Sequence, residues 1–226
     1  EDSGEIRLFL GRSDGGFDDP SLLQPTAAAT GAPIDFWDDT VLADVDGDGI
    51  LDLVGNGASP PASALYLCPG DGAGSFEPCI PIARVFPSLP FFADLDADGL
   101  LDLTYLDAGF AARRLRFRRG IGGGLLGPEL ATSQDGDRFP WGFQLSDVDD
   151  DGALEIVAMQ QTVPSSTSDP AIYWYPDAFD PTTPPVLIGQ DPTFFSFNVV
   201  DIDSDGDEDI VAFSGQFMHA FERTGP

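Results

Sequence analysis

The chain has 226 residues, and its formal charge of −29 comes from 39 acidic and only ten basic residues, all of them arginine. This charge excludes the basic surface that nucleic-acid binding requires, and no apolar stretch approaches the roughly 20 residues of a membrane span. The acidic residues recur in short clusters between apolar runs, and 42% of the residues are hydrophobic. The sequence therefore predicts a folded domain and not a disordered acidic tail.

One acidic segment recurs four times along the chain. It reads ADVDGDGILDL from Ala43, ADLDADGLLDL from Ala93, SDVDDDGALEI from Ser146 and VDIDSDGDEDI from Val200. Successive copies are spaced by 50, 53 and 54 residues. Because β-type residues lie before and after each copy, each segment is predicted to be the loop of a β-hairpin.

A weaker element separates the acidic loops, namely a short alternating strand followed by a turn that is usually glycine-rich. Its copies are IRLFLGRSDGGF, LYLCPGDGAGSF, LRFRRGIGGGLLG and IYWYPDAFDP. Together with the hairpin it gives about four strands in roughly 50 residues, which is the period of a propeller blade. No long window shows the 3.6-residue period of a helix.

These repeats predict an all-β chain that forms one β-propeller domain over residues 1–226, with about four to five four-stranded blades. The expected repeats are 1–35 (partial), 36–85, 86–138, 139–192 and 193–226. The chain starts with the second half of a blade. This phase fits either a small closed propeller, in which N-terminal strands complete the last blade, or part of a larger propeller.

The loop pattern D-x-D-x-D-G-x-x-[DE] matches the ligand needs of calcium, which takes six to eight oxygen ligands. Positions 1, 3, 5 and 9 supply carboxylates, position 7 a backbone carbonyl, and the glycine at position 6 permits the turn. We predict about four calcium ions, held by Asp44, Asp46, Asp48, Ile50 and Asp52; Asp94, Asp96, Asp98, Leu100 and Asp102; Asp147, Asp149, Asp151, Ala153 and Glu155; and Asp201, Asp203, Asp205, Asp207 and Asp209.

The loops differ from two familiar kinds of metal site. An EF-hand would have glutamate at position 12 and flanking helices, whereas position 12 here is Gly55, Tyr105, Ala158 or Ala212 and the flanks are strand-like. One histidine and two cysteines disfavour zinc. The aspartates could instead be solvated turn formers, although four copies in register favour a metal.

With these loops the chain resembles the FG-GAP/VCBS repeats of calcium-binding propellers, as in integrin α-subunit heads and many bacterial secreted proteins. The resemblance covers nearly the whole chain, although the Phe-Gly and Gly-Ala-Pro landmarks are poorly kept. It implies a propeller in which calcium braces a hairpin loop of each blade. Ligands in that family bind elsewhere, at the faces or between blades.

The two cysteines, Cys68 and Cys79, flank the turn PGDGAGSFEP. A disulfide across this hairpin is expected if the protein is exported. The alternative is two unpaired buried cysteines.

Two groups of side chains are candidates for a ligand surface. Aromatic residues recur before each acidic loop, and Trp37 and Trp141 are the candidates for stacking on a sugar or a partner; packing between blades is the alternative. Arg114, Arg116 and Arg118 share one face of a predicted strand. They either dock an anionic glycan or acidic partner, or form a solvated blade edge.

The expected function is that of a non-catalytic, secreted or cell-surface calcium-binding propeller for adhesion or recognition. Its partner would be a protein or glycan at a propeller face, with no nucleic acid and no membrane insertion. A carbohydrate-binding (lectin-like) propeller, or an accessory domain of a polysaccharide-acting enzyme, is the alternative. Because His219 is the only histidine, triad chemistry is disfavoured, and a propeller enzyme that uses its acids is a third hypothesis.

Overall fold

The computed structural model describes residues 6–59, 62–83, 87–107, 114–131, 138–162, 169–177, 179–180 and 183–223. Within these ranges all regular structure is β, which confirms the all-β prediction. No helix in the described ranges is long and apolar enough to cross a membrane.

The strands form five antiparallel sheets whose order follows the chain. A two-stranded sheet comes first, then three four-stranded sheets and one three-stranded sheet. Their strands are β1 (Ile6–Leu8) and β2 (Ser21–Leu23); β3 (Asp35–Ala43), β4 (Asp52–Ser59), β5 (Ala62–Cys68) and β6 (Ile80–Ala83); β7 (Pro87–Ala93), β8 (Asp102–Asp107), β9 (Arg114–Arg118) and β10 (Leu130–Ala131); β11 (Arg138–Ser146), β12 (Glu155–Thr162), β13 (Ala171–Tyr175) and β14 (Val186–Gln190); β15 (Phe194–Val200), β16 (Asp209–Ser214) and β17 (Met218–Phe221).

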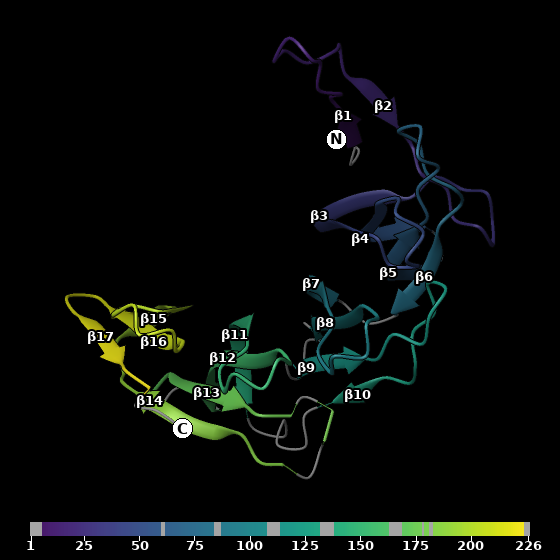
Figure 1. The fold of residues 1–226 in the computed structure, drawn as a ribbon. Helices are drawn as coiled ribbons and strands as arrows, with labels where there is room; N and C mark the ends of the chain where they lie inside the picture. Colours follow the sequence, from purple (N-terminus) through teal and green to yellow (C-terminus); the bar gives the residue numbers. More distant parts are fainter. Residues whose placement is uncertain are drawn as a thin grey trace.

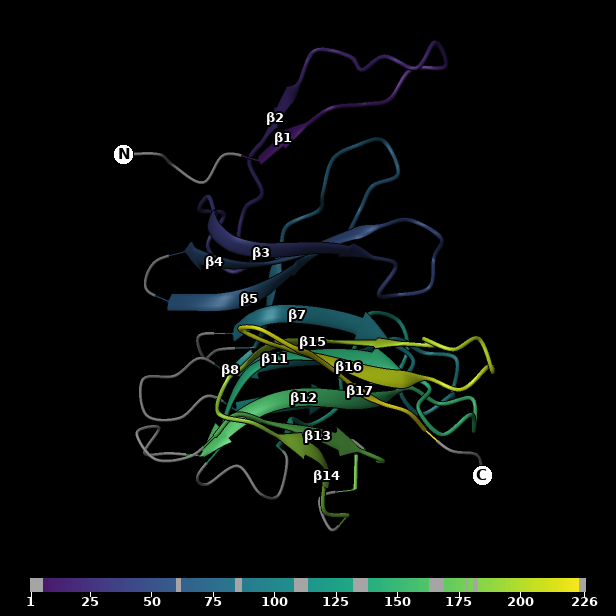
Figure 2. The same ribbon diagram turned by 90° about the vertical axis from the view of Figure 1, so that its left-hand side faces the viewer.

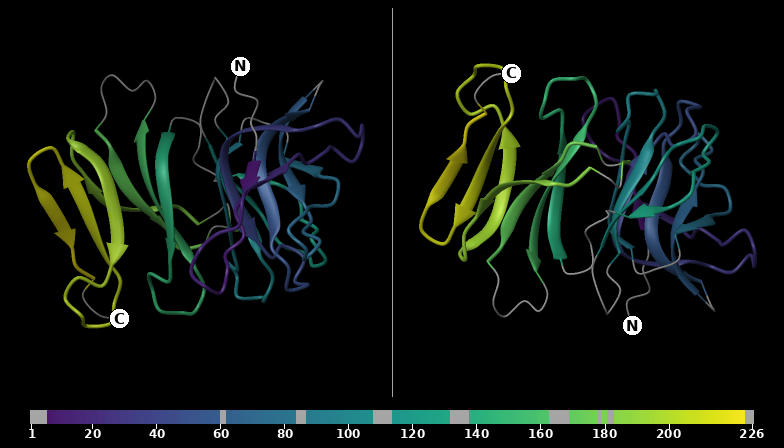
Figure 3. Two further views of the ribbon diagram at one scale, coloured as in Figure 1. Left: turned by 90° about the horizontal axis from the view of Figure 1, so that it is seen from above. Right: turned by 90° about the horizontal axis from the view of Figure 1, so that it is seen from below.

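The sheets follow one another around an open arc, with β1 and β2 at one end and β15–β17 at the other (Figures 1 and 2). Seen from above and below, the later sheets stand side by side (Figure 3). The arc of described sheets does not close into a ring.

Successive sheets are joined by hydrophobic clusters that use alternate residues of each second strand. In β4, Leu53 belongs to the cluster that Ile6 of the first sheet joins, whereas Val54 packs with Leu103 and Tyr105 of β8. The pattern recurs at the next two junctions. Because side chains alternate between the two faces of a strand, a second strand between two sheets is buried on both faces, as the nearly continuous burial along β4 and β8 shows.

The disulfide predicted between Cys68 and Cys79 is present. Both cysteines are fully buried in the cluster between the first two sheets. The bond links the end of β5 to the residue before β6, so it closes the turn that connects these neighbouring strands.

Arg118 of β9 bridges two sheets, and Arg116 of the same strand pairs within its own sheet. The Arg118 guanidinium donates to the carbonyls of Gly127 (2.8 Å), Leu126 (3.1 Å) and, across the sheet junction, Ile82. Arg116 pairs with Asp107 at 3.1 Å and Glu129 at 3.2 Å. The strand β9 is also not an edge, because β10 flanks it.

Replacing Arg118 by leucine should destabilise the fold, because three backbone carbonyls lose a charged donor. We expect a loss of about 2 kcal/mol in the free energy of unfolding, measured by urea denaturation. The control is Arg12→Leu, since Arg12 is half exposed and pairs with the neighbouring exposed Asp14. This substitution should lower the free energy of unfolding by less than about 0.5 kcal/mol. Equal effects of the two substitutions would contradict the inter-sheet role of Arg118.

Candidate metal centres

The four acidic loops connect the first and second strands of the four larger sheets: β3 to β4, β7 to β8, β11 to β12 and β15 to β16. These first strands lie across the arc and all point the same way, so the four loops lie on one side of it (Figure 2). They are called loop 1 (residues 44–52), loop 2 (94–102), loop 3 (147–155) and loop 4 (201–209).

Each loop is folded around its own carboxylates. The aspartate at position 1 accepts the N–H of the position-6 glycine, at 2.8–3.2 Å in the four loops. The aspartate at position 5 accepts the N–H of position 7, at 2.7–3.0 Å. These short-range bonds curl the backbone around the side chains, as Asx turns do.

The curl requires left-handed backbone at two positions of every loop. Position 6 has φ between 86° and 100° and is always glycine, as the sequence predicted. Position 4 is also left-handed, and only loop 1 has glycine there; Ala97, Asp150 and Ser204 occupy it elsewhere. They are the only non-glycine residues with positive φ in the part of the chain that the structure describes. Such backbone costs an L-residue about 1–2 kcal/mol, so the loop bonds impose it.

The acid at position 9 has a structural role that the sequence did not reveal. Asp102 is fully buried, and its two oxygens accept the N–H groups of Leu95 (2.9 Å) and Gly120 (2.7 Å). It thereby joins the start of loop 2 to the residues that follow the third strand. Asp52 and Asp209 make the same two connections, and Glu155 makes the first of them.

Burial raises the pKa of three of the position-9 acids. Desolvation raises the pKa of Asp52 and Asp102 above the ordinary value, and it raises the pKa of Glu155 to about 7. The backbone N–H groups act in the opposite direction on all three, and nearby aspartates of the same loop add to the rise.

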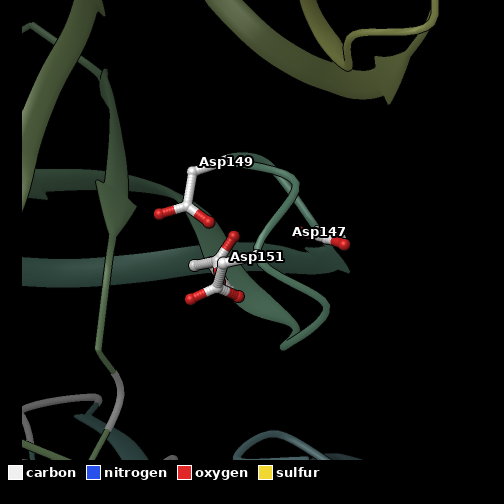
Figure 4. A group of neighbouring side chains, drawn as sticks. Asp147, Asp149 and Asp151 are labelled. Carbon is white, nitrogen blue, oxygen red and sulfur yellow. The ribbon is translucent and has the colours of Figure 1, made fainter. Parts of the chain in front are cut away.

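In each loop three or four carboxylates lie close together. Loop 3 brings one oxygen each of Asp147, Asp149, Asp151 and Glu155 within 4.8 Å of one another; the three aspartates project from a single turn of chain (Figure 4). The other loops bring three carboxylates together: Asp44, Asp46 and Asp48; Asp94, Asp96 and Asp102; and Asp201, Asp203 and Asp209. The predicted ligands Asp52, Asp98 and Asp205 lie outside these groups, and the carbonyl ligands at Ile50, Leu100, Ala153 and Asp207 remain predictions.

The donor set fits a hard cation. Each group consists of carboxylate oxygens alone, the ligands that calcium prefers. One oxygen each of Asp96, Asp147 and Asp149 is buried without a hydrogen-bond donor. An unpartnered buried carboxylate oxygen is costly in a folded protein, and a bound cation would remove that cost. The residues present therefore suit calcium at all four loops.

The residues predicted to form a ligand surface do not form one exposed group in the structure. Arg118 bridges two sheets and Arg116 pairs with acids of its own sheet, which favours a structural role for both. Trp141 is 40% exposed and lies at a break in the β11–β12 register. The side chains of Trp37 and Arg114 lie outside the described residues.

Comparison with known proteins agrees with this geometry. A family model described as FG-GAP-like repeat matches residues 44–105 and 147–212. The two spans begin at the first aspartates of loops 1 and 3, and together they cover more than half of the chain. Among curated proteins the comparison finds no match.

Changing Asp102 to asparagine should destabilise the protein even when calcium is absent. The asparagine NH2 group would face one of the two backbone N–H groups that the carboxylate accepts, so that N–H would lose its acceptor. The expected loss is about 1–3 kcal/mol in urea denaturation with a chelator present. Asp98→Asn is the control, since Asp98 lies in the exposed part of the same loop. If the two substitutions cost the same under chelation, position 9 has no separate structural role.

Proposed function

This chain belongs to the family of FG-GAP-like repeat proteins, and we propose that it is a non-catalytic, calcium-binding propeller module for adhesion or recognition outside the cell. The observation that carries the proposal is the convergence of carboxylates in four equivalent loops on one side of the arc. Each loop joins the first two strands of its sheet, where a bound ion would hold the hairpin closed.

Calcium would supply the positive charge that the loops lack. Its best-placed ligands are the acids at positions 1, 3 and 5 in loop 1, at positions 1, 3 and 9 in loops 2 and 4, and at all four positions in loop 3. Eight positive charges from four ions would offset part of the formal charge of −29. Magnesium suits the loops less well, because it prefers octahedral sites that keep several waters.

The propeller architecture is supported by the repetition of one sheet design. Three four-stranded antiparallel sheets and one three-stranded sheet follow the same strand order, and each packs on the next through equivalent faces. Blades of a propeller pack in this manner around a central axis. We propose four to five blades in this chain, in a propeller that is either small or part of a larger ring.

An extracellular location is supported by two further observations. The chain contains a buried disulfide, a bond that persists in oxidising compartments. FG-GAP repeats are typical of extracellular proteins, where calcium is also plentiful. A binding role and not a catalytic one is favoured by the single histidine, and by the use of the clustered acids to hold a metal.

Removing calcium should lower the melting temperature, and adding it back should restore the original value. Ligands that bind only the folded state stabilise it by about 2.7 kcal/mol per site at a concentration of 100 Kd. Asp46→Asn should remove one ion and leave three, with a smaller thermal response to calcium than the wild-type protein shows. Asp14→Asn, in an exposed turn outside the loops, is the control. A melting temperature that ignores chelator would refute the calcium assignment.

A second candidate function, glycan binding, is favoured by a repeated irregularity in the first strands. Each of β3, β7, β11 and β15 contains a register break where it pairs with the second strand of its sheet. A β-bulge re-aims side chains, and here it leaves Trp141 40% and Phe195 59% exposed. Exposed aromatic rings of this kind can stack on the apolar faces of sugars.

A glycan array probed in calcium would test this second candidate. Binding to a saccharide should be lost in Trp141→Ala and retained in Phe217→Ala, a bulky exposed aromatic outside the strand breaks. An array that stays blank with the wild-type protein, or binding that survives Trp141→Ala, would count against glycan recognition at this surface.

A further inference from the structure

We propose that each of loops 1 to 3 is held in shape by the segment that follows the third strand of the next sheet. Calcium binding in one repeat and docking of the next repeat would then stabilise each other. The inference rests on the proposed calcium function. It extends that function, because it makes residues outside the loops positioning residues for the metal.

At the first junction the contact is steric. The turn 120–126, which follows β9, is closed by a bridge between Gly120 and Leu126. A Cβ atom added to Gly124 would lie 3.2 Å from the Cβ of Asp46 in loop 1. Added to Gly122 or Gly123, it would meet nothing within 4 Å. The tip of the turn therefore lies directly against the position-3 aspartate of loop 1, in the preceding sheet.

At the second junction the contact runs through an arginine. Arg119 pairs with one oxygen of Asp96, the position-3 aspartate of loop 2, at 3.3 Å. Its guanidinium lies 4.5 Å from the ring centre of Phe179, and Phe179 is a buried residue between β13 and β14 of the next sheet. The other oxygen of Asp96 has no donor. Phe179 thus supports the Arg119 guanidinium, which in turn orients Asp96, a predicted metal ligand.

At the third junction the contact is ionic. Arg223, which follows β17, pairs with Asp150 at 2.6 Å and donates to the carbonyl of Asp149 at 3.1 Å, both in loop 3. Its own backbone N–H donates to Asp209 of loop 4 at 3.0 Å. One residue therefore connects two successive acidic loops, one through its side chain and the other through its backbone.

The three contacts differ in chemistry, yet each comes from the same place in the repeat. A glycine turn, an aromatic ring and an arginine all follow the third strand; the turn and Arg223 reach the preceding acidic loop directly, and Phe179 reaches it through Arg119. The turn 70–76 provides an internal comparison, because a Cβ on Gly74 would instead meet Leu8 of β1, at 3.2 Å. The tip of that turn faces an apolar side chain of the preceding sheet and not an acidic loop there, although Gly72 in the same turn lies beside Ile50 of loop 1 in its own sheet.

The first test uses two glycines of the same turn. Gly123 and Gly124 both have positive φ, 61° and 72°, so alanine introduces similar backbone strain at either position. Only Gly124→Ala also pushes on Asp46. In calorimetric calcium titrations, Gly124→Ala should weaken one of the sites about 5-fold or more, whereas Gly123→Ala should match the wild-type protein. Equal calcium affinities in the two variants would overturn the proposal.

The second test needs no variant at the turn and so does not depend on Gly124→Ala folding. Hydrogen exchange is measured with and without calcium in the wild-type protein and in Asp46→Asn. Calcium should slow exchange at residues 122–125 in the wild-type protein. In Asp46→Asn the same addition of calcium should slow exchange there much less. Exchange at residues 12–16, the turn between β1 and β2, should respond equally in both proteins. Calcium protection of 122–125 that survives Asp46→Asn would contradict the coupling.

The outcomes for the coupling and for the calcium function can be told apart. A titration that shows no calcium binding defeats both. Calcium binding at loop 1, with unchanged exchange at residues 122–125, defeats the coupling alone.

Discussion

Repulsion among carboxylates is the constraint on which this structure depends. Each loop holds three or four carboxylate oxygens within 4.8 Å of one another, and two unit charges 4 Å apart interact with about 4 kcal/mol at an effective dielectric constant near 20. Backbone N–H groups offset part of this repulsion and fix the shape of the loop. They leave oxygens of Asp96, Asp147 and Asp149 buried without donors, and a cation in loops 2 and 3 would satisfy them.

The position-9 acid connects the shape of each loop to the sheet that carries it. Because the buried carboxylate of Asp102 holds both the loop and the residues after the third strand, the loop cannot move without disturbing three strands. Asp52 and Asp209 make equivalent contacts in two other sheets, and segments after the third strand also reach the preceding loop at the first and third junctions. Loop shape, sheet formation and sheet packing are therefore parts of one arrangement, in which a cation in the loops would stabilise elements well beyond its ligands.

Much of this could be predicted from the sequence, because the information is local and repeated. The acidic pattern predicted the hairpin loops and their position-6 glycines, and the short separation of Cys68 and Cys79 suggested the disulfide. The role of Arg118 was not predictable, since its partners include Ile82, which lies in another sheet. The left-handed backbone at Ala97 gave no signal either, because alanine carries no preference for it. Whether the sheets close depends on the angle between successive sheets, which no local pattern encodes.

Anomalous diffraction from crystals grown in calcium tests most directly whether the four loops are calcium sites. We predict one peak inside each loop, among the carboxylates of Asp44, Asp94, Asp147 and Asp201 and their loop neighbours. Loops that are ordered in saturating calcium and contain no peak would contradict the calcium assignment.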